Sequence, residues 1–185
     1  MGRVVLVTGA ARSGKSEWAE RLVRESGKAA VYVATAQRYP NDAEWDARIE
    51  THIQRRPAEW GSLEVPIELT AAIEAARTGE ILLVDSLGTW VGNLLDESEA
   101  DWQLHYEALV RQVRGCDADI VFVAEETGWG VVPAHAIGRL FRDRLGRLGR
   151  VMGQVADQTF LVVAGFAIDV QRIGVAIDRP RSLLD

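Results

Sequence analysis

Residues 9 to 16 constrain this chain more than any other segment, because they match the pattern G-x-x-x-x-G-K-[ST]. The segment follows the apolar run Val4–Val7 and precedes an amphipathic stretch, and this order of strand, loop and helix is the context in which such a loop binds phosphate. Its glycines let backbone N–H groups turn inward, and the N-terminus of the following helix adds partial positive charge. We therefore expect a nucleoside triphosphate to bind on the loop residues Gly9, Ala10, Ala11, Arg12, Ser13, Gly14, Lys15 and Ser16.

Three side chains are expected to act on the phosphates. Lys15 is expected to reach the β- and γ-phosphates, and the hydroxyl of Ser16 to bind Mg²⁺. Asp85 ends the apolar run Ile81–Val84, which has the form of a Walker B strand that carries a carboxylate to its end. There Asp85 can hold Mg²⁺ directly or through water, facing the loop. The alternative for Asp85 is a cap of the next helix or the start of a turn.

Short apolar runs alternate with longer helical patterns along the whole chain. The runs are continuously apolar, which is typical of strands buried on both faces of a parallel sheet. We expect one α/β domain over residues 1–185, a P-loop NTPase with a mostly parallel sheet flanked by helices and the nucleotide at the carboxyl ends of the strands. Residues 166–185 are expected to form an irregular tail, which includes Arg179-Pro180-Arg181. The order of the strands stays open. Strands are expected at Val4–Val7, Ala29–Ala34, Ile81–Val84, Ile120–Ala124 and Thr159–Val163, and helices at Ser13–Ser26, Asp42–Arg56, Glu68–Arg77, Ala100–Arg114 and Pro133–Ala156.

Composition excludes several classes of function. The net charge of −6 argues against broad binding to nucleic acid, which requires a basic face. The single Cys116 cannot form an internal disulfide and suits a reducing cytoplasm. The longest apolar stretch, residues 160–168, is too short to span a bilayer, and no targeting signal is expected at the N-terminus. We expect a cytoplasmic protein without a membrane span.

His52 is the candidate nucleophile. If residues 42–56 are helical, Arg48 and Arg56 lie four residues before and after His52, on the same face. Nearby positive charge disfavours protonation of an imidazole, and a neutral imidazole beside phosphate-binding arginines can attack phosphorus. From spacing alone, a solvated basic face on a surface helix is the alternative.

Five arginines lie on the later helical segment and are expected to be solvated or to face another subunit. They are Arg139, Arg142, Arg144, Arg147 and Arg150.

In these segments the chain resembles the bifunctional adenosylcobinamide kinase / adenosylcobinamide-phosphate guanylyltransferase family of cobalamin synthesis. The matches occur in order and at near-constant spacing over roughly residues 4 to 165. They include Leu6 to Ser16, Tyr32-Val33-Ala34-Thr35, Arg48-Ile49, His52, Arg56-Pro57 with Trp60, Leu82 to Leu95 through Asp85, Glu126 to Pro133, Phe141-Arg142-Asp143, Gly146-Arg147, Ala156-Asp157 and Leu161-Val162-Val163 with Gly165.

The resemblance implies two reactions. A nucleoside triphosphate, ATP or GTP, phosphorylates the aminopropanol hydroxyl of adenosylcobinamide. GTP then guanylylates His52, and the GMP moves to adenosylcobinamide phosphate. The resemblance also implies a RecA-like topology, a homotrimer, and nucleotide contacts beyond the loop. Those further contacts are Ala34, Thr35, Ala36, Ile53, Gln54, Arg55, Arg56, Glu64 and Asp85.

Glu64 is expected to select guanine, because a carboxylate accepts hydrogen bonds from the N1–H and 2-amino groups that adenine lacks. The chain also departs from the family pattern. Glu125 stands where the family commonly has Asn, Gly149-Arg150 where it has Asn-Gln, and Gly88 where it has Thr. Two alternatives to the bifunctional enzyme stay open: a small-molecule kinase in which His52 only binds phosphate, and a nucleotide-binding protein without catalysis.

Overall fold

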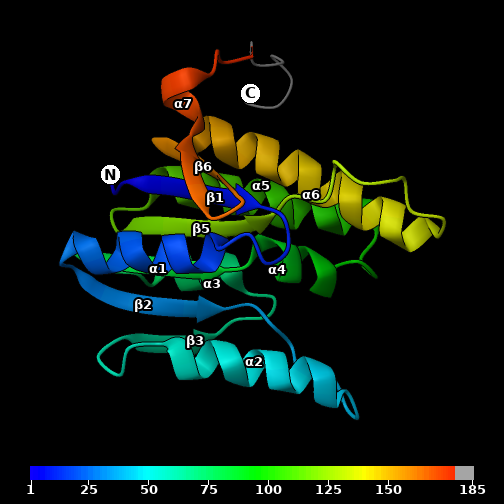
Figure 1. The fold of residues 1–185 in the computed structure, drawn as a ribbon, viewed down its shortest axis with the longest axis horizontal. Helices are drawn as coiled ribbons and strands as arrows, with labels where there is room; N and C mark the ends of the chain where they lie inside the picture. The colour runs from blue at the N-terminus through cyan, green and yellow to red at the C-terminus, as the bar shows by residue number, and fades with distance from the viewer. Residues whose placement is uncertain (178–185) are drawn as a thin grey trace.

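The computed structural model describes residues 1–177 and contains a seven-stranded sheet in the order β3-β2-β4-β5-β1-β6-β7 (Figure 1). All neighbouring strands are parallel except β6 and β7, which are antiparallel. The expected α/β class with a mostly parallel sheet is confirmed. One strand, β5, lies between β1, which leads into the phosphate loop, and β4, which ends in Asp85. The strands are β1 (Val4–Gly9), β2 (Ala29–Ala34), β3 (Gly61–Glu64), β4 (Glu80–Asp85), β5 (Asp119–Glu125), β6 (Gln158–Val163) and β7 (Phe166–Asp169).

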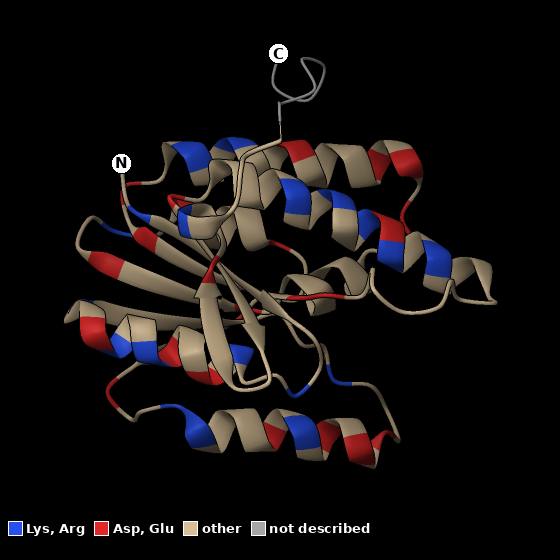
Figure 2. Ribbon diagram, turned by 45° about the horizontal axis from the view of Figure 1, so that its top comes forward, with Lys and Arg blue, Asp and Glu red and all other residues tan. Residues whose placement is uncertain are grey.

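Helices cover both faces of the sheet (Figure 1). Alternate residues of β1 divide between two cores, with Leu6 on one side and Val5 on the other. The larger core packs against α3, α4, α5 and α6, and the smaller against α1. Charged residues lie mainly along the helices and at the ends of strands (Figure 2). The central parts of the strands are apolar because helices cover both faces of the sheet. The helices are α1 (Lys15–Ser26), α2 (Ala43–Arg55), α3 (Leu69–Glu74), α4 (Leu87–Asn93), α5 (Glu99–Gly115), α6 (Ala136–Val155) and α7 (Val170–Ile173).

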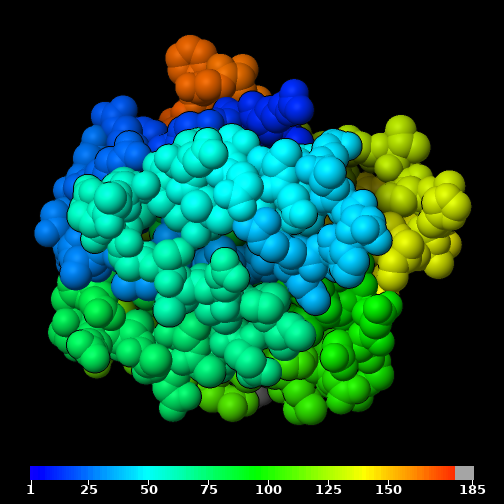
Figure 3. All heavy atoms as spheres, turned by 90° about the horizontal axis from the view of Figure 1, so that it is seen from below, coloured from blue at the N-terminus to red at the C-terminus, as the bar shows by residue number. Residues whose placement is uncertain are grey.

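Helix α2 differs from the other long helices because it buries none of its residues. It lies beyond the β3 edge of the sheet and forms an outer layer on that side of the molecule (Figures 1 and 3). Asp42 caps its N-terminus by accepting a hydrogen bond from the Trp45 backbone N–H at 2.9 Å. The expected helix over residues 42–56 is therefore present, with its two terminal residues as caps.

The expected irregular tail from residue 166 is wrong for its first eight residues, which form β7 and α7. A two-residue turn at Ala164 and Gly165, with φ of 50° and 80°, joins β6 to β7. Positive φ at both positions is the geometry that matches the twist of a hairpin. Arg179-Pro180-Arg181 lies outside the described residues.

Arg144 is another difference between expectation and structure, because it is buried rather than solvated. Its guanidinium donates to the carbonyl oxygens of Leu94 at 2.8 Å and Glu97 at 3.0 Å, and it stacks 5.0 Å from the ring centroid of Trp102. It therefore fastens α6 to the connection between α4 and α5. Within residues 1–177 no helix has the length and apolar character needed to cross a bilayer.

We predict that Arg144→Ala lowers the free energy of unfolding by about 2–4 kcal/mol, because two buried carbonyl groups lose their donor. Urea unfolding followed by circular dichroism measures this change. Arg150 lies on the same helix but is exposed, so Arg150→Ala is the matched control and should change stability by less than about 0.5 kcal/mol. Equal effects of the two substitutions would contradict this role for Arg144.

Candidate functional site

A cleft of about 650 Å³ opens at the carboxyl edge of the parallel strands. Parallel strands all end at the same edge, so residues that follow them meet there. The phosphate loop follows β1, Ala34 and Ala36 come at the end of β2, and Glu64, Asp85 and Glu125 end β3, β4 and β5. Helix α2 closes the cleft on the side of β3. The lining includes the predicted residues Ala11, Arg12, Ser13, Gly14, Lys15, Ser16, Ala34, Ala36, His52, Ile53, Arg55, Arg56, Glu64 and Asp85.

Four residues predicted to contact nucleotide lie outside this lining: Gly9, Ala10, Thr35 and Gln54. Gln54 is exposed on α2. Thr35 is fully buried, and its hydroxyl donates to the Ser86 carbonyl at 2.7 Å and accepts from the Ser86 N–H at 2.9 Å. The Thr35 side chain thus holds the segment that follows Asp85 in place.

The backbone of the phosphate loop depends on its glycines. Gly14 has φ of +94°, a left-handed conformation, and caps α1 directly before Lys15. A Cβ at Gly9 would lie 2.4 Å from the Val162 carbonyl oxygen and 2.7 Å from Ser13 Oγ. No side chain fits at Gly9, so the close approach of the loop to β6 requires glycine.

Asp85 joins the sheet to α2 through its carboxylate. Its Oδ2 accepts a hydrogen bond of 2.8 Å from the Tyr32 hydroxyl and lies 3.6 Å from His52 Nδ1. The second distance is longer than a hydrogen bond but is close enough for an electrostatic contact. Burial raises the pKa of Tyr32 above its ordinary value, and the Asp85 charge acts in the same direction, so Tyr32 remains a hydrogen-bond donor. The sequence placed Tyr32 in a strand and in a segment that resembles the family, and gave no sign that it is a partner of Asp85.

Arginines at the end of α2 fasten it to the domain. Arg55 donates to Glu17 and Glu20 of α1, both at 3.1 Å. Arg56 stacks 4.0 Å from the ring centroid of Tyr32 and donates to Ser62 Oγ at 2.8 Å. The spacing argument placed Arg56 beside His52, and both line the cleft; it missed the carboxylate of Asp85 that faces the imidazole.

Two departures from the family pattern meet in the structure. The Glu125 side chain lies over Gly88, where a Cβ would fall 1.8 Å from Glu125 Oε2. Both residues line the cleft beside the phosphate loop. With the Glu125 carboxylate in this place, position 88 has no room for a side chain.

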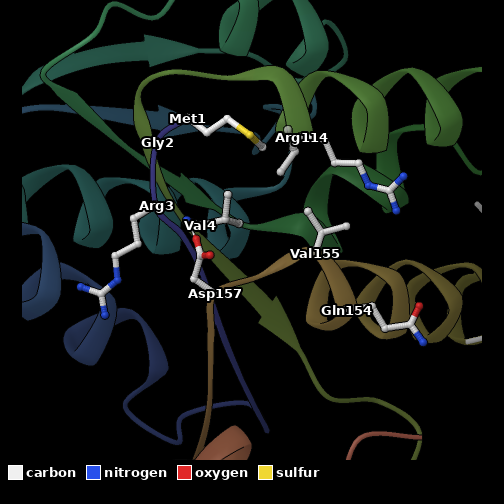
Figure 4. A pocket seen from close by; sticks show the side chains of 9 residues that line it. Met1, Gly2, Arg3, Val4, Arg114, Gln154, Val155 and Asp157 are labelled. Atoms are coloured by element: carbon white, nitrogen blue, oxygen red, sulfur yellow. Dashed lines mark hydrogen bonds between the residues drawn. The ribbon is translucent and has the colours of Figure 1, made fainter. Parts of the chain in front are cut away.

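A second hollow, of about 610 Å³, lies at the opposite end of β1 (Figure 4). Met1, Arg3, Arg114 and Asp157 are among the residues that line it. It contains none of the predicted site residues. The predicted chemistry is concentrated in the cleft at the carboxyl edge.

We predict that Gly9→Ala raises the dissociation constant for a GTP analogue with a methylene bridge between the α- and β-phosphorus atoms at least about tenfold and costs about 1–3 kcal/mol of stability, because the methyl group must displace the loop or β6. Isothermal titration calorimetry with Mg²⁺ measures the affinity. Gly27→Ala is the control: Gly27 also has a positive φ, of +66°, but no atom lies within 4 Å of its Cβ position. It should lose stability and keep its nucleotide affinity. Unchanged affinity in Gly9→Ala would contradict the assigned loop geometry.

Comparison with known proteins identifies relatives of this chain. The family model described as cobinamide kinase / cobinamide phosphate guanyltransferase matches residues 5–170. The bifunctional adenosylcobalamin biosynthesis protein CobP of Pseudomonas aeruginosa is 40% identical over 90% of this chain and 96% of its own length. The corresponding CobU of Escherichia coli is 36% identical, over 91% of this chain and 99% of its own.

A solved structure from Pyrococcus horikoshii shares the fold, with a TM-score of 0.56 at 13% identity over 100% of this chain and 94% of that one. At that identity the likeness supports the fold alone. The family model and the two bacterial relatives show more: this chain belongs to the cobinamide kinase / cobinamide phosphate guanyltransferase family.

Proposed function

We propose that this chain phosphorylates adenosylcobinamide with a nucleoside triphosphate and then transfers GMP from GTP, through His52, to adenosylcobinamide phosphate. The observation that carries the proposal is that His52 and the phosphate loop line the same cleft. A loop of this kind binds the triphosphate of either ATP or GTP, because it contacts phosphate and not the base. Family membership supplies the substrate class.

In the first reaction the loop and Lys15 hold the β- and γ-phosphates, and Lys15 stabilises the negative charge of the transfer. Mg²⁺ supplies further charge neutralisation when it is bound. Ser16 and Asp85 are the residues that would hold the ion. This donor set suits Mg²⁺, which takes one or two carboxylates and fills its other positions with water and substrate phosphate. Within residues 1–177 no group of three His, Cys, Asp or Glu side chains could hold a metal, so a dedicated all-protein cage is not what this cleft offers.

In the second reaction a ring nitrogen of His52 attacks the α-phosphorus of GTP. An N–P bond forms, and the bond from the α-phosphorus to the bridging oxygen breaks, which releases pyrophosphate. A phosphate oxygen of the corrinoid then attacks the same phosphorus, and the imidazole leaves. Asp85 faces Nδ1 and leaves Nε2 as the nitrogen directed away from it. Arg55 and Arg56 line the same region of the cleft and would neutralise phosphate charge.

Glu64, at the carboxyl end of β3, is the proposed reader of guanine. It is exposed and lines the cleft next to α2. An ionised carboxylate offers two acceptor oxygens to the N1–H and 2-amino groups. Its exposure and its place in the lining leave its carboxylate open to a base that enters the cleft.

We further propose a homotrimer in the cytoplasm, as the family resemblance implies. The buried, reduced Cys116 suits a reducing compartment. Exposed apolar side chains such as Trp129, Val131 and Phe166 offer surfaces for assembly or for the corrinoid.

GTP labelled at the α-phosphate tests the role of His52. We predict an acid-labile, alkali-stable adduct on the wild-type protein, because a phosphoramidate forms, and no adduct on His52→Ala. His105, on α5, is not part of the cleft, so His105→Ala is the control and should label like wild type. Labelling of His52→Ala at the wild-type level would refute nucleotidyl transfer through His52. Phosphorylation of cobinamide without any α-label would favour the plain kinase.

A base-selectivity experiment tests Glu64. We predict that Glu64→Gln weakens GTP binding about 10–100-fold, because one charged acceptor is lost, and leaves ATP binding within threefold. Competition binding with GTP, ATP and inosine triphosphate measures the selectivity. Glu59 is an exposed acidic residue outside the cleft, and Glu59→Gln is the matched control. Parallel loss of GTP and ATP affinity in Glu64→Gln would contradict a base-reading role.

A further inference from the structure

Glu125 occupies a position in the cleft that the steps above leave without a role. It ends β5, the strand between β1 and β4, and it pairs in register with Gly9 at the start of the phosphate loop. Its side chain therefore borders the loop on the side of β4, and it lines the cleft together with Lys15 and Asp85.

The space for this carboxylate is created by Gly88, in α4. An ideal Cβ at Gly88 would lie 1.8 Å from Glu125 Oε2 and 2.7 Å from Glu125 Cδ. Real atoms do not approach so closely, so any side chain at position 88 would displace the carboxylate. Gly88 has no positive φ that would itself require glycine. The absence of a side chain at position 88 lets the Glu125 carboxylate reach the wall of the cleft.

The Glu125 carboxylate has hydrogen-bonding capacity that the described protein atoms do not satisfy. Its Oε2 is out of contact with solvent and has no hydrogen-bond partner among residues 1–177. A buried acceptor without a hydrogen bond costs free energy, so a ligand that donates a hydrogen bond to it binds more tightly. Burial raises the pKa of the Glu125 carboxyl above its ordinary value, and the nearby charge of Lys15 acts against this shift. A carboxylate in these surroundings is a stronger base than one in water.

We propose that Glu125 binds the hydroxyl group of the acceptor and takes its proton during phosphoryl transfer. The inference rests on the proposed kinase reaction. The hydroxyl oxygen forms a bond to the γ-phosphorus, the bond from that phosphorus to the bridging oxygen breaks, and the nucleoside diphosphate leaves. The hydroxyl proton moves to a carboxylate oxygen of Glu125 and passes to solvent when the products leave. Glu125 has no part in the attack of His52, because a ring nitrogen that attacks phosphorus through its lone pair has no hydroxyl proton for a base to remove.

The charge of the site favours a base over a further metal ligand. A carboxylate that stays ionised beside the γ-phosphate repels it, whereas one that becomes protonated as the transfer proceeds does not. Lys15 compensates the charge before the transfer. Asp85 and Ser16 already provide the ligands that Mg²⁺ needs from the protein.

Glu125→Gln tests the inference, since the amide keeps the shape of the side chain but cannot take the proton. We expect the turnover number for cobinamide phosphorylation to fall at least about 100-fold. We expect α-label transfer to His52 and the affinity for Mg²⁺–nucleotide to stay within threefold of wild type. Glu126→Gln is the matched control. Glu126 only accepts a hydrogen bond from the Gly128 N–H at 2.7 Å, which the Gln carbonyl can also do, so kinase turnover should be unchanged.

Gly88→Ala tests the same idea without removing the carboxylate. The added methyl group must push the Glu125 side chain from its place, so kinase turnover should fall at least tenfold while guanylylation of His52 persists. The double variant Gly88→Ala/Glu125→Gln should be no slower than Glu125→Gln alone, because the methyl group acts only through the carboxylate. Thermal melting checks that each variant is folded.

The outcomes separate this inference from the function on which it rests. Wild-type kinase turnover in folded Glu125→Gln overturns the role of Glu125. A tenfold or greater loss of Mg²⁺–nucleotide affinity in that variant also overturns it, in favour of a metal ligand. If instead the wild-type protein fails to phosphorylate cobinamide, the proposed function itself is refuted.

Discussion

The carboxylate of Asp85 is the contact on which the arrangement of the cleft depends. It stands at the end of a buried strand, where the parallel neighbours β2 and β5 hold it in register. From there it accepts the Tyr32 hydroxyl and faces the imidazole of His52. The strands at the centre of the sheet are buried, whereas α2 has no buried residues. The position of the proposed nucleophile relative to the phosphate loop therefore relies on a few polar contacts made by Asp85, Arg55 and Arg56.

The energies of these contacts are modest. The exposed pair of Arg55 with Glu17 contributes about 0–1 kcal/mol, and the pair with the buried Glu20 must offset the desolvation of that carboxylate. Both therefore stabilise α2 far less than core burial stabilises α5 or α6. Helix α2 thus belongs to the part of the structure with the lowest local stability. Such a helix can adjust to a bound nucleotide at little cost, which suits a cleft that must first hold a triphosphate and then bring an imidazole to one of its phosphorus atoms.

The sequence alone predicts most strands of the sheet and the loop expected to bind phosphate, and it does so for physical reasons. Strands buried on both faces must be continuously apolar, and β1, β2, β4, β5 and β6 all follow that rule. This rule did not predict strands β3 and β7, because each is a short strand at an edge of the sheet with exposed or partly exposed residues. Their pairing is decided by their neighbours and, for β7, by the turn at Ala164-Gly165. Helix α4 has seven residues and begins two residues after Asp85. A segment of this length shows too little helical periodicity for the sequence to predict it.

The site residues that the sequence predicts are those whose chemistry is local, such as the loop at 9–16. Contacts between distant segments could not be found in the same way. The hydroxyl of Tyr32 meets a carboxylate 53 residues away, and no periodicity reports such a pair. Glu125 and Gly88 were each visible as departures from a family pattern, but only the fold shows that one makes room for the other. The same holds for Arg144, whose guanidinium is held by carbonyl groups in the connection between α4 and α5.

The central claim is that one cleft holds the triphosphate and presents His52 to its α-phosphorus. A crystal structure with Mg²⁺ and a GTP analogue that has a methylene bridge between the α- and β-phosphorus atoms tests it most directly, since attack by the imidazole cannot release pyrophosphate. We expect the β- and γ-phosphates on the loop with Lys15, and a ring nitrogen of His52 within about 3.5 Å of the α-phosphorus. An analogue bound on the loop with its α-phosphorus out of reach of every His52 in the assembly would contradict the account.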